Sequence, residues 1–236
     1  MVKSVTIGSL YLDEQPAVLG SEYEPGQSIR IGSSVEQNKI HWMIINGLFV
    51  PSKCLLRNVS WDDLNKQGLV FGQRVIIDRL AFQCRLLKVG SRKDEKNEWD
   101  EVKNIIGDID LRSNPGELLF WGQESLSNQE QYRVVRGCKT RYWGYNASCK
   151  RFRNVGYLPA LEPVTVEVNE SLTGEDLMIW TKDGDSVIGR LVEYSDYDLL
   201  LADGACITGI SSAVRNQSGV TAVERTEIQF VQTFEK

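Results

Sequence analysis

The sequence predicts an α+β protein in which a β-rich N-terminal part leads to a mixed domain and then to a small five-stranded β-barrel. Short runs of β-branched and aromatic residues, bounded by turn residues, recur along all 236 residues. Only two stretches carry helix signals, in which a capping residue precedes an amphipathic turn. After Pro163, five short strand patterns follow one another almost without a helix signal, which is typical of a small barrel.

We therefore expect three parts: a β-rich segment over residues 1–58 packed on the next domain, a domain over 59–163, and the barrel over 164–236. In the first part, residues 4–12 and 28–31 have strand composition. Residues 41–50 contain Asn46-Gly47 between two apolar runs. Asn-Gly predicts a tight hairpin there, because both central residues of such a turn need a positive φ.

The second part contains both predicted helices. Ser60 and Asp63 form a variant of the capping box and open a short helix that Gly68 ends. Asn97 caps a second helix, over residues 98–106, which Gly107 ends. Four apolar residues of this helix are expected on one face: Trp99, Val102, Ile105 and Ile106.

The remaining strands follow from apolar runs between turn signals. Two are expected within residues 69–89, and one each at 118–121, 132–136 and 156–161. The last two are expected to pair as scaffold strands, with an irregular segment between them. In the barrel, turns at Asp183-Gly184 and at residues 194–197 separate the first three strands.

Composition excludes several classes of function. The formal charge is −5, and a sequence pI near 5.1 argues against a general nucleic-acid-binding protein. No apolar run is long enough to span a membrane, and no secretory signal is visible, so we expect a cytoplasmic protein or part of a particle released by lysis. The five cysteines form no C-x-x-C pair, and His41 is the only histidine, so no cofactor or metal is expected. Whether Cys138 and Cys149 form a disulfide stays open, because their spacing fixes no geometry.

Residues 132–161 are the most informative stretch, because seven basic residues and six aromatic residues alternate there without a carboxylate. Its middle is rich in Tyr, Asn, Ser, Gly and Arg, the residues that dominate adaptable recognition loops. Arg adds stacking and bidentate contacts. A structural loop over acidic neighbours and a display surface are both compatible with this composition. For the display surface, the candidate binding residues are Arg141, Tyr142, Trp143, Tyr145, Asn146, Ser148, Arg151 and Arg153.

The two ends of this stretch resemble a known signature. RVVRG at 133–137 and NVGYLPAL at 154–161 resemble the C-terminal motif of the formylglycine-generating, sulfatase-modifying family. The resemblance covers roughly residues 59–163. That family shares a C-type-lectin-like fold with the variable proteins of diversity-generating retroelements, in which the corresponding loop binds ligands. The resemblance thus implies a C-type-lectin-like domain with residues 141–154 on its binding face. The enzymes bind copper through two nearby cysteines, whereas Cys138 and Cys149 lie farther apart here.

Residues 182–204 resemble the first motif of Sm-like proteins, with a charged Asp-Gly hairpin and an aromatic–Asp turn. Asp198 stands where that family has the asparagine that contacts RNA bases. A carboxylate there is unfavourable for a phosphate-rich ligand. The resemblance therefore implies an Sm- or SH3-like barrel without the RNA function.

The leading hypothesis is a non-enzymatic binding or structural protein of phage or mobile-element origin. It would contact a protein or carbohydrate ligand through residues 141–154 and attach to itself or to an assembly partner through the barrel. Two alternatives stay open: a copper oxidase related to the formylglycine-generating enzymes, with Cys138 and Cys149 as metal-binding thiols, and RNA binding through the basic loop and the barrel.

Overall fold

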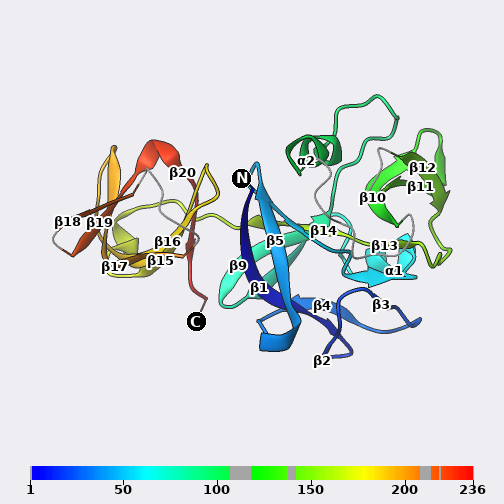
Figure 1. Ribbon diagram of the computed structural model, residues 1–236, viewed down its shortest axis with the longest axis horizontal. Coiled ribbons are helices and arrows are strands. Elements are labelled where there is room, and N and C mark those ends of the chain that lie inside the picture. Colours follow the sequence, from blue (N-terminus) through cyan, green and yellow to red (C-terminus); the bar gives the residue numbers. More distant parts are fainter. Residues whose placement is uncertain (1, 107–117, 138–141, 208–213, 218, 236) are drawn as a thin grey trace.

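The protein is built from three β-sheets, which lie side by side along its longest axis (Figure 1). The computed structural model describes residues 2–106, 118–137, 142–207, 214–217 and 219–235. Strands account for 52 % and helices for 11 % of the described residues, and one of the three sheets is a half-barrel. The predicted α+β class is therefore wrong, and the protein is β-rich. The two capping signals were read correctly, but each opens a helix of only 6 or 9 residues.

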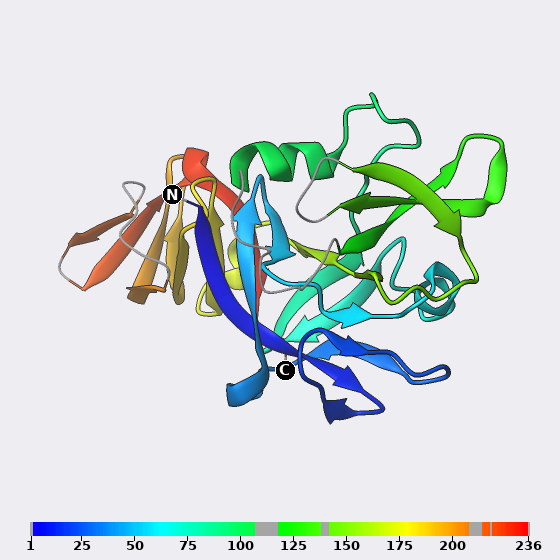
Figure 2. The same cartoon turned by 45° about the vertical axis from the view of Figure 1, so that its right-hand side comes forward.

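The central sheet has eight strands and contains the predicted hairpin (Figure 2). Asn46 and Gly47 connect its two strands with φ angles of 49° and 82°, which confirms the Asn-Gly turn. The strand order is β2-β1-β5-β6-β14-β9-β8, and β4 also pairs with β1. In chain order the strands are β1 (Lys3–Leu12), β2 (Gln15–Pro16), β4 (Ile29–Gly32), β5 (Lys39–Ile45), β6 (Leu48–Pro51), β8 (Gln73–Ile77), β9 (Leu80–Leu86) and β14 (Pro159–Pro163).

The second sheet holds most of the basic and aromatic stretch, in the order β12-β11-β10-β13-β7-β3. Its strands are β3 (Ser21–Glu22), β7 (Leu56–Arg57), β10 (Leu119–Leu126), β11 (Gln129–Gly137), β12 (Trp143–Ala147) and β13 (Val155–Tyr157). Two expectations about it are wrong. The segment expected to be irregular forms β12, and the two flanking motifs do not pair, because β10 lies between β11 and β13 and pairs with both.

Both predicted helices form where the capping residues place them. In α1 (Trp61–Lys66), Ser60 and Asp63 complete a reciprocal capping box. In α2 (Glu98–Ile106), the N–H of Asp100 donates to Oδ1 of Asn97 at 3.0 Å. Ile105 is 46 % exposed and does not belong to the buried face, which contains Trp99, Val102 and Ile106. The predicted helix end at Gly107 lies outside the described residues.

The C-terminal sheet replaces the expected five-stranded barrel. Its order is β18-β19-β17-β16-β15-β20, so a sixth strand, β18, extends one edge and the described part of the sheet stays open. One face encloses a separate apolar core formed by Leu177, Val187, Leu201 and their neighbours. The strands are β15 (Asp176–Thr181), β16 (Ser186–Tyr194), β17 (Asp198–Cys206), β18 (Val214–Gln217), β19 (Val220–Glu224) and β20 (Ile228–Thr233). The described residues also form the 3-10 turns η1 (Glu36–Asn38), η3 (Glu170–Leu172) and η4 (Arg225–Glu227).

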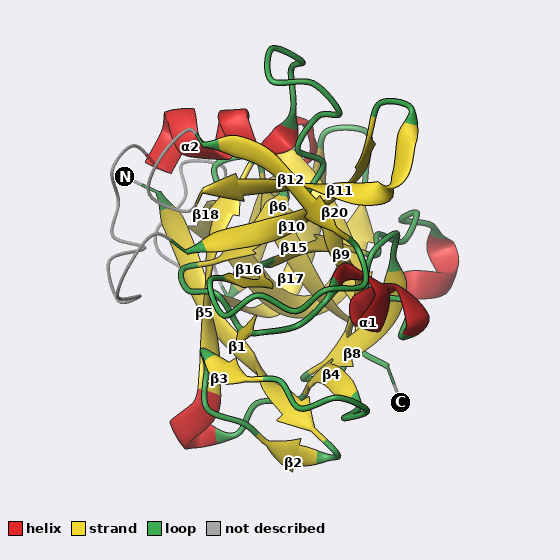
Figure 3. Ribbon diagram, turned by 90° about the vertical axis from the view of Figure 1, so that its right-hand side faces the viewer, coloured by secondary structure: helices red, strands yellow, loops and turns green. Residues whose placement is uncertain are grey.

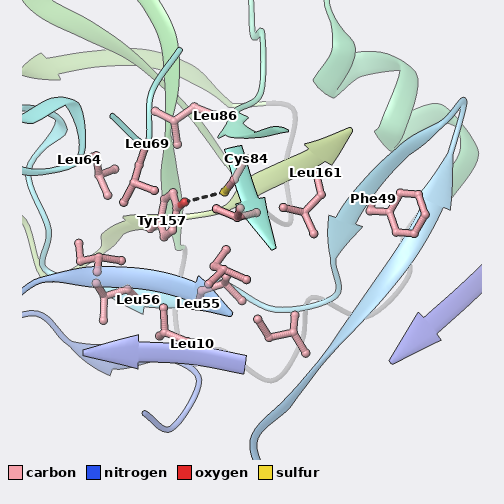
Figure 4. Close-up of a cluster of buried hydrophobic side chains, with 14 of the residues drawn as sticks. Leu10, Phe49, Leu55, Leu56, Leu64, Leu69, Cys84, Leu86, Tyr157 and Leu161 are labelled. Carbon is pink, nitrogen blue, oxygen red and sulfur yellow. Dashed lines mark hydrogen bonds between the residues drawn. The ribbon is translucent and has the colours of Figure 1, made fainter. Parts of the chain in front are cut away.

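The other face of the C-terminal sheet shares the main core of the molecule. The ring of Trp180 meets that of Phe49 edge to face at 4.9 Å between centroids. Figure 4 shows part of this core, where Tyr157 and the Cys84 thiol form a hydrogen bond of 3.2 Å. Burial raises the pKa of Cys84 to about 12 and raises that of Tyr157 well above its usual value. Cys84 is therefore a packing residue and not a reactive thiol.

Candidate functional site

Strands β11 and β12 form a two-stranded ribbon at one edge of the second sheet, and among the described strands only β11 pairs with β12. Figure 3 shows β12, β11 and β10 in succession, with α1 nearby. Residues that pair across an antiparallel ladder point to the same face. Because Arg133 pairs with Asn146 and Val134 pairs with Tyr145, the ribbon displays two different surfaces.

The first surface, here called the Arg133 face, lies on the side of α1. The guanidinium carbon of Arg133 lies 3.8 Å from the ring centroid of Trp61, and Asn146 is directly opposite on β12. Phe71 meets the edge of Trp61 at 5.9 Å and is 63 % exposed. The Nε1–H of Trp61 donates to the carbonyl of Gly122 at 3.1 Å, which fixes the indole plane against β10.

Tyr142 completes the Arg133 face. A Cβ atom on Gly144 would lie 2.5 Å from the hydroxyl oxygen of Tyr142, so the ring of Tyr142 lies over the backbone of residue 144. The absence of a side chain at Gly144 therefore makes room for the ring of Tyr142, which is 47 % exposed.

Arg133 is only partly hydrated. Burial lowers the pKa of its guanidinium, whereas the charges of Asp62 and Glu130 act in the opposite direction. The Nε atom is buried and has no hydrogen-bond partner. Among the described residues, no carboxylate oxygen lies within salt-bridge distance of Arg133, although its neighbours in sequence Arg136 and Arg151 both have one.

The second surface, here called the Tyr145 face, lies on the side of α2. Tyr132, Trp143 and Tyr145 form a row of edge-to-face contacts, with centroids 5.6 Å and 6.4 Å apart. Trp143 is half-buried, packs against the core beneath α2 and donates its Nε1–H to the carbonyl of Gly90 at 3.3 Å. Tyr145 is 50 % exposed. On this face Trp143 is therefore held in place by the core, and Tyr145 is exposed to solvent.

Two arginines of the stretch serve the fold. Arg136 is fully buried and pairs with Asp100 of α2. Arg151 holds the capping box of α1 through two hydrogen bonds to Asp63, of 2.8 Å and 2.7 Å. Burial alone would raise the pKa of Asp63, but the hydrogen bonds from Arg151 and Ser60 outweigh it and hold the pKa below its usual value.

The eight predicted binding residues are thus divided among several places. Arg141 lies outside the described residues. Tyr142 and Asn146 belong to the Arg133 face, and Trp143 and Tyr145 belong to the Tyr145 face. Ser148 joins β12 to α1, because its carbonyl accepts from the N–H of Asp62 at 3.1 Å. Arg151 is engaged with Asp63, and Arg153 is exposed without an ion pair to a described residue.

Sequence reasoning missed three residues of the Arg133 face: Arg133 itself, Trp61 and Phe71. The sequence correctly predicts a strand at Arg133, but it does not predict the contact of this side chain with Trp61. The exposed Phe71 sits between Val70 and Gly72 after a helix, a place where the sequence alone cannot separate a core residue from a surface residue. No local pattern connects Trp61 with Arg133.

A pocket of about 260 Å³ lies on the C-terminal sheet around the turn between β16 and β17. Tyr197 is 82 % exposed there, beside Asp196 and Glu224. The Oδ1 of Asp198 accepts from the hydroxyl of Ser195 at 2.9 Å, as expected of a residue that shapes a turn.

The cysteines and the possible metal ligands offer no further site in the part of the chain that the structure describes. Cys149 is a free, exposed thiol, and Cys138, the second thiol of the copper hypothesis, lies outside the described residues. No group of three or more His, Cys, Asp or Glu side chains comes together within the described ranges. The described helices include none long and apolar enough to cross a membrane.

Comparisons with protein-family models, with curated proteins and with solved structures found no match. The C-type-lectin-like and Sm-like assignments therefore stay predictions from sequence motifs. The geometry of the β11–β12 ribbon is the strongest basis for assigning a function.

Proposed function

We propose that this is a non-enzymatic binding protein that holds a partner protein on the β11–β12 ribbon. One observation carries the proposal: Tyr142 and Tyr145 are exposed beside and on an edge strand that Trp143 anchors in the core. Tyr142 is 47 % exposed and Tyr145 is 50 % exposed. Tyrosine gives a large contact area at low cost in conformational entropy, which suits a protein interface.

The surrounding fold supports this interpretation of the ribbon. Trp143 anchors β12 in the core under α2, and Arg151 ties the following segment to α1. The side chains that remain exposed are therefore held in position before any partner arrives. Such preorganisation reduces the entropic cost of binding.

Photo-crosslinking tests the proposal. p-Benzoylphenylalanine replaces Tyr145 in one variant and Val18 in a control variant, since Val18 is 70 % exposed and belongs to neither face. Both are expressed in the source cell and irradiated. We expect a defined adduct from position 145 only. Excess wild-type protein without the photoreactive residue should suppress this adduct by competition, whereas an excess of a Tyr142→Ser, Tyr145→Ser variant should not. The same adducts from both positions would refute the proposal.

A second contact surface is proposed on the C-terminal sheet, for assembly. Three apolar side chains around the β16–β17 turn are exposed: Val192 at 48 %, Tyr194 at 36 % and Tyr197 at 82 %. Exposed apolar groups gathered at one turn suit a contact with another copy or with an assembly partner. Light scattering at rising concentration compares wild type with Tyr194→Ser, Tyr197→Ser. An equal mass for both proteins at every concentration contradicts self-assembly through this turn.

A further inference from the structure

We propose that Arg133 is a binding site for a carboxylate, which an acidic side chain of the bound protein supplies. The inference rests on the proposed function, because it names the chemistry that the Arg133 face recognises. It concerns Arg133 with Trp61, Phe71 and Asn146, and it does not involve the Tyr145 face.

The first step is the hydrogen-bonding state of Arg133. A guanidinium has five N–H donors and no acceptor. Arg133 donates none of them to a described residue, and its Nε–H is buried without a partner. Arg136 also has an unpartnered Nε, but its terminal nitrogens donate to the carbonyl of Val89 and to Asp100. A partly desolvated cation without an acceptor is unfavourable, and a carboxylate at the terminal nitrogens, which are not among the buried unpartnered atoms, supplies charge-assisted hydrogen bonds.

The second step is orientation. The stack on Trp61, at 3.8 Å, fixes one face of the guanidinium plane, and the indole is itself fixed by its hydrogen bond to Gly122. A guanidinium that stacks on a ring still offers N–H groups at the edge of its own plane, where a carboxylate can accept two parallel hydrogen bonds. Phe71, 63 % exposed at the edge of Trp61, provides apolar contact for the methylene groups of an Asp or Glu side chain.

The third step is charge. Lys150 and Arg153, on the same stretch of chain, are exposed and have no ion pair with a described residue. The charges of Asp62 and Glu130, which both raise the pKa of Arg133, are negative. They weaken the site for a phosphate, which carries close to two charges, more than for a carboxylate, which carries one. A carboxylate is therefore the favoured anion.

Packing alone gives a competing explanation for the stack. Arginine often covers an aromatic ring with its apolar stem while its charge stays in water. In that case Arg133 would respond to dissolved anions only through general screening, with no preference for a carboxylate.

The test is an NMR titration of the wild-type chain. The Nε–H of Arg133 is the reporter group, and Arg133→Lys identifies its signal. The probe is the peptide acetyl-Gly-Glu-Gly-amide, with acetyl-Gly-Gln-Gly-amide as the uncharged match and inorganic phosphate at equal ionic strength as a third arm. We expect saturable shifts of the Arg133 Nε–H and Trp61 Nε1–H signals with the Glu peptide, at a dissociation constant of about 1–10 mM for one charged contact. Equal shifts with the Gln peptide or with phosphate overturn the proposal, as does no shift at all.

Two variants complete the design. Arg133→Lys keeps the charge but loses the planar fork, so binding of the Glu peptide, followed at Trp61, weakens by about tenfold. Arg190→Gln is the matched control, because Arg190 is an exposed arginine on the C-terminal sheet, and it leaves peptide binding unchanged. Unchanged binding in Arg133→Lys overturns the proposal. If a partner crosslinks at position 145 but the Arg133 signal does not respond to the Glu peptide, this inference is wrong and the proposed function stands. If the Arg133 signal responds but no partner crosslinks at position 145, the proposed function is wrong.

Discussion

Replacing Asp63 by Asn should destabilise the protein by removing the anchor between α1 and the ribbon. Asp63 is 8 % exposed and accepts hydrogen bonds from Ser60 and from two nitrogens of Arg151. Asn has nearly the same shape, so the cavity does not change. It has no charge, however, and its amide group places a donor toward the donors of Arg151.

The size of the effect follows from the exposure of the two partners. Hydrogen bonds to a charged group are worth about 1.5–3 kcal/mol. The side chain of Arg151 is 33 % exposed, so it regains water when its partner is lost, and the loss stays below the 3–5 kcal/mol of a fully buried pair. We expect about 2 kcal/mol, which corresponds to a fall in Tm of about 4–8 °C for a chain of this size.

Urea unfolding at several pH values measures this change in the free energy of unfolding. Because the pKa of folded Asp63 lies below its usual value of about 3.9, its stabilising contribution is present above that pH and is lost as the pH falls through the folded pKa. The difference between wild type and Asp63→Asn should therefore shrink in acid. Arg151→Met completes a double-mutant cycle with a coupling of about 1 kcal/mol or more. Additive effects, or a difference independent of pH, would refute the reasoning.

Three further predictions concern single side chains. Trp143→Ala should cost about 2 kcal/mol because Trp143 packs on the core, whereas Tyr145→Ala, at an exposed position, should cost less than about 0.5 kcal/mol; equal losses in thermal unfolding contradict the division of the ribbon. A thiol reagent should modify Cys149 in the folded protein and reach Cys84 only after unfolding, as peptide mass spectrometry will show. Tyr157→Phe should lower the free energy of unfolding by about 1 kcal/mol by leaving the Cys84 thiol without its partner, and unchanged urea unfolding speaks against that hydrogen bond.

Sequence reasoning was right where a structure depends on residues close together in the chain. The Asn46-Gly47 turn and the capping box of Ser60 and Asp63 each require only a few consecutive residues. Their conformations follow from local sterics and hydrogen bonding. The conformations of such a turn and of such a capping box therefore depend little on the distant parts of the chain.

The errors concern pairing between distant segments. Residues 143–147 have the composition of a recognition loop, but they become a strand because β11 offers them a ladder. The parallel pairing of β10 with β13 separates two motifs that looked like neighbours. β-Propensity depends on such neighbours more than on the strand itself. The same limit hides the Arg133 face, because its residues come from α1, the segment after it, β11 and β12.

The basic stretch is therefore two sets of residues with different physical roles. Arg136 and Arg151 are each matched by one carboxylate on a helix, Asp100 of α2 and Asp63 of α1, so their charges are neutralised within the fold. Arg133 is stacked on Trp61 and has no acceptor among the described residues, although a side chain such as Met could cover the ring without burying part of a charge. The proposed binding role accounts for a cation at this position, and the peptide titration distinguishes it from a cation–π contact alone. Phe71 and Tyr142, which are exposed on the same face as Arg133, place that cation within a surface suited to a protein partner.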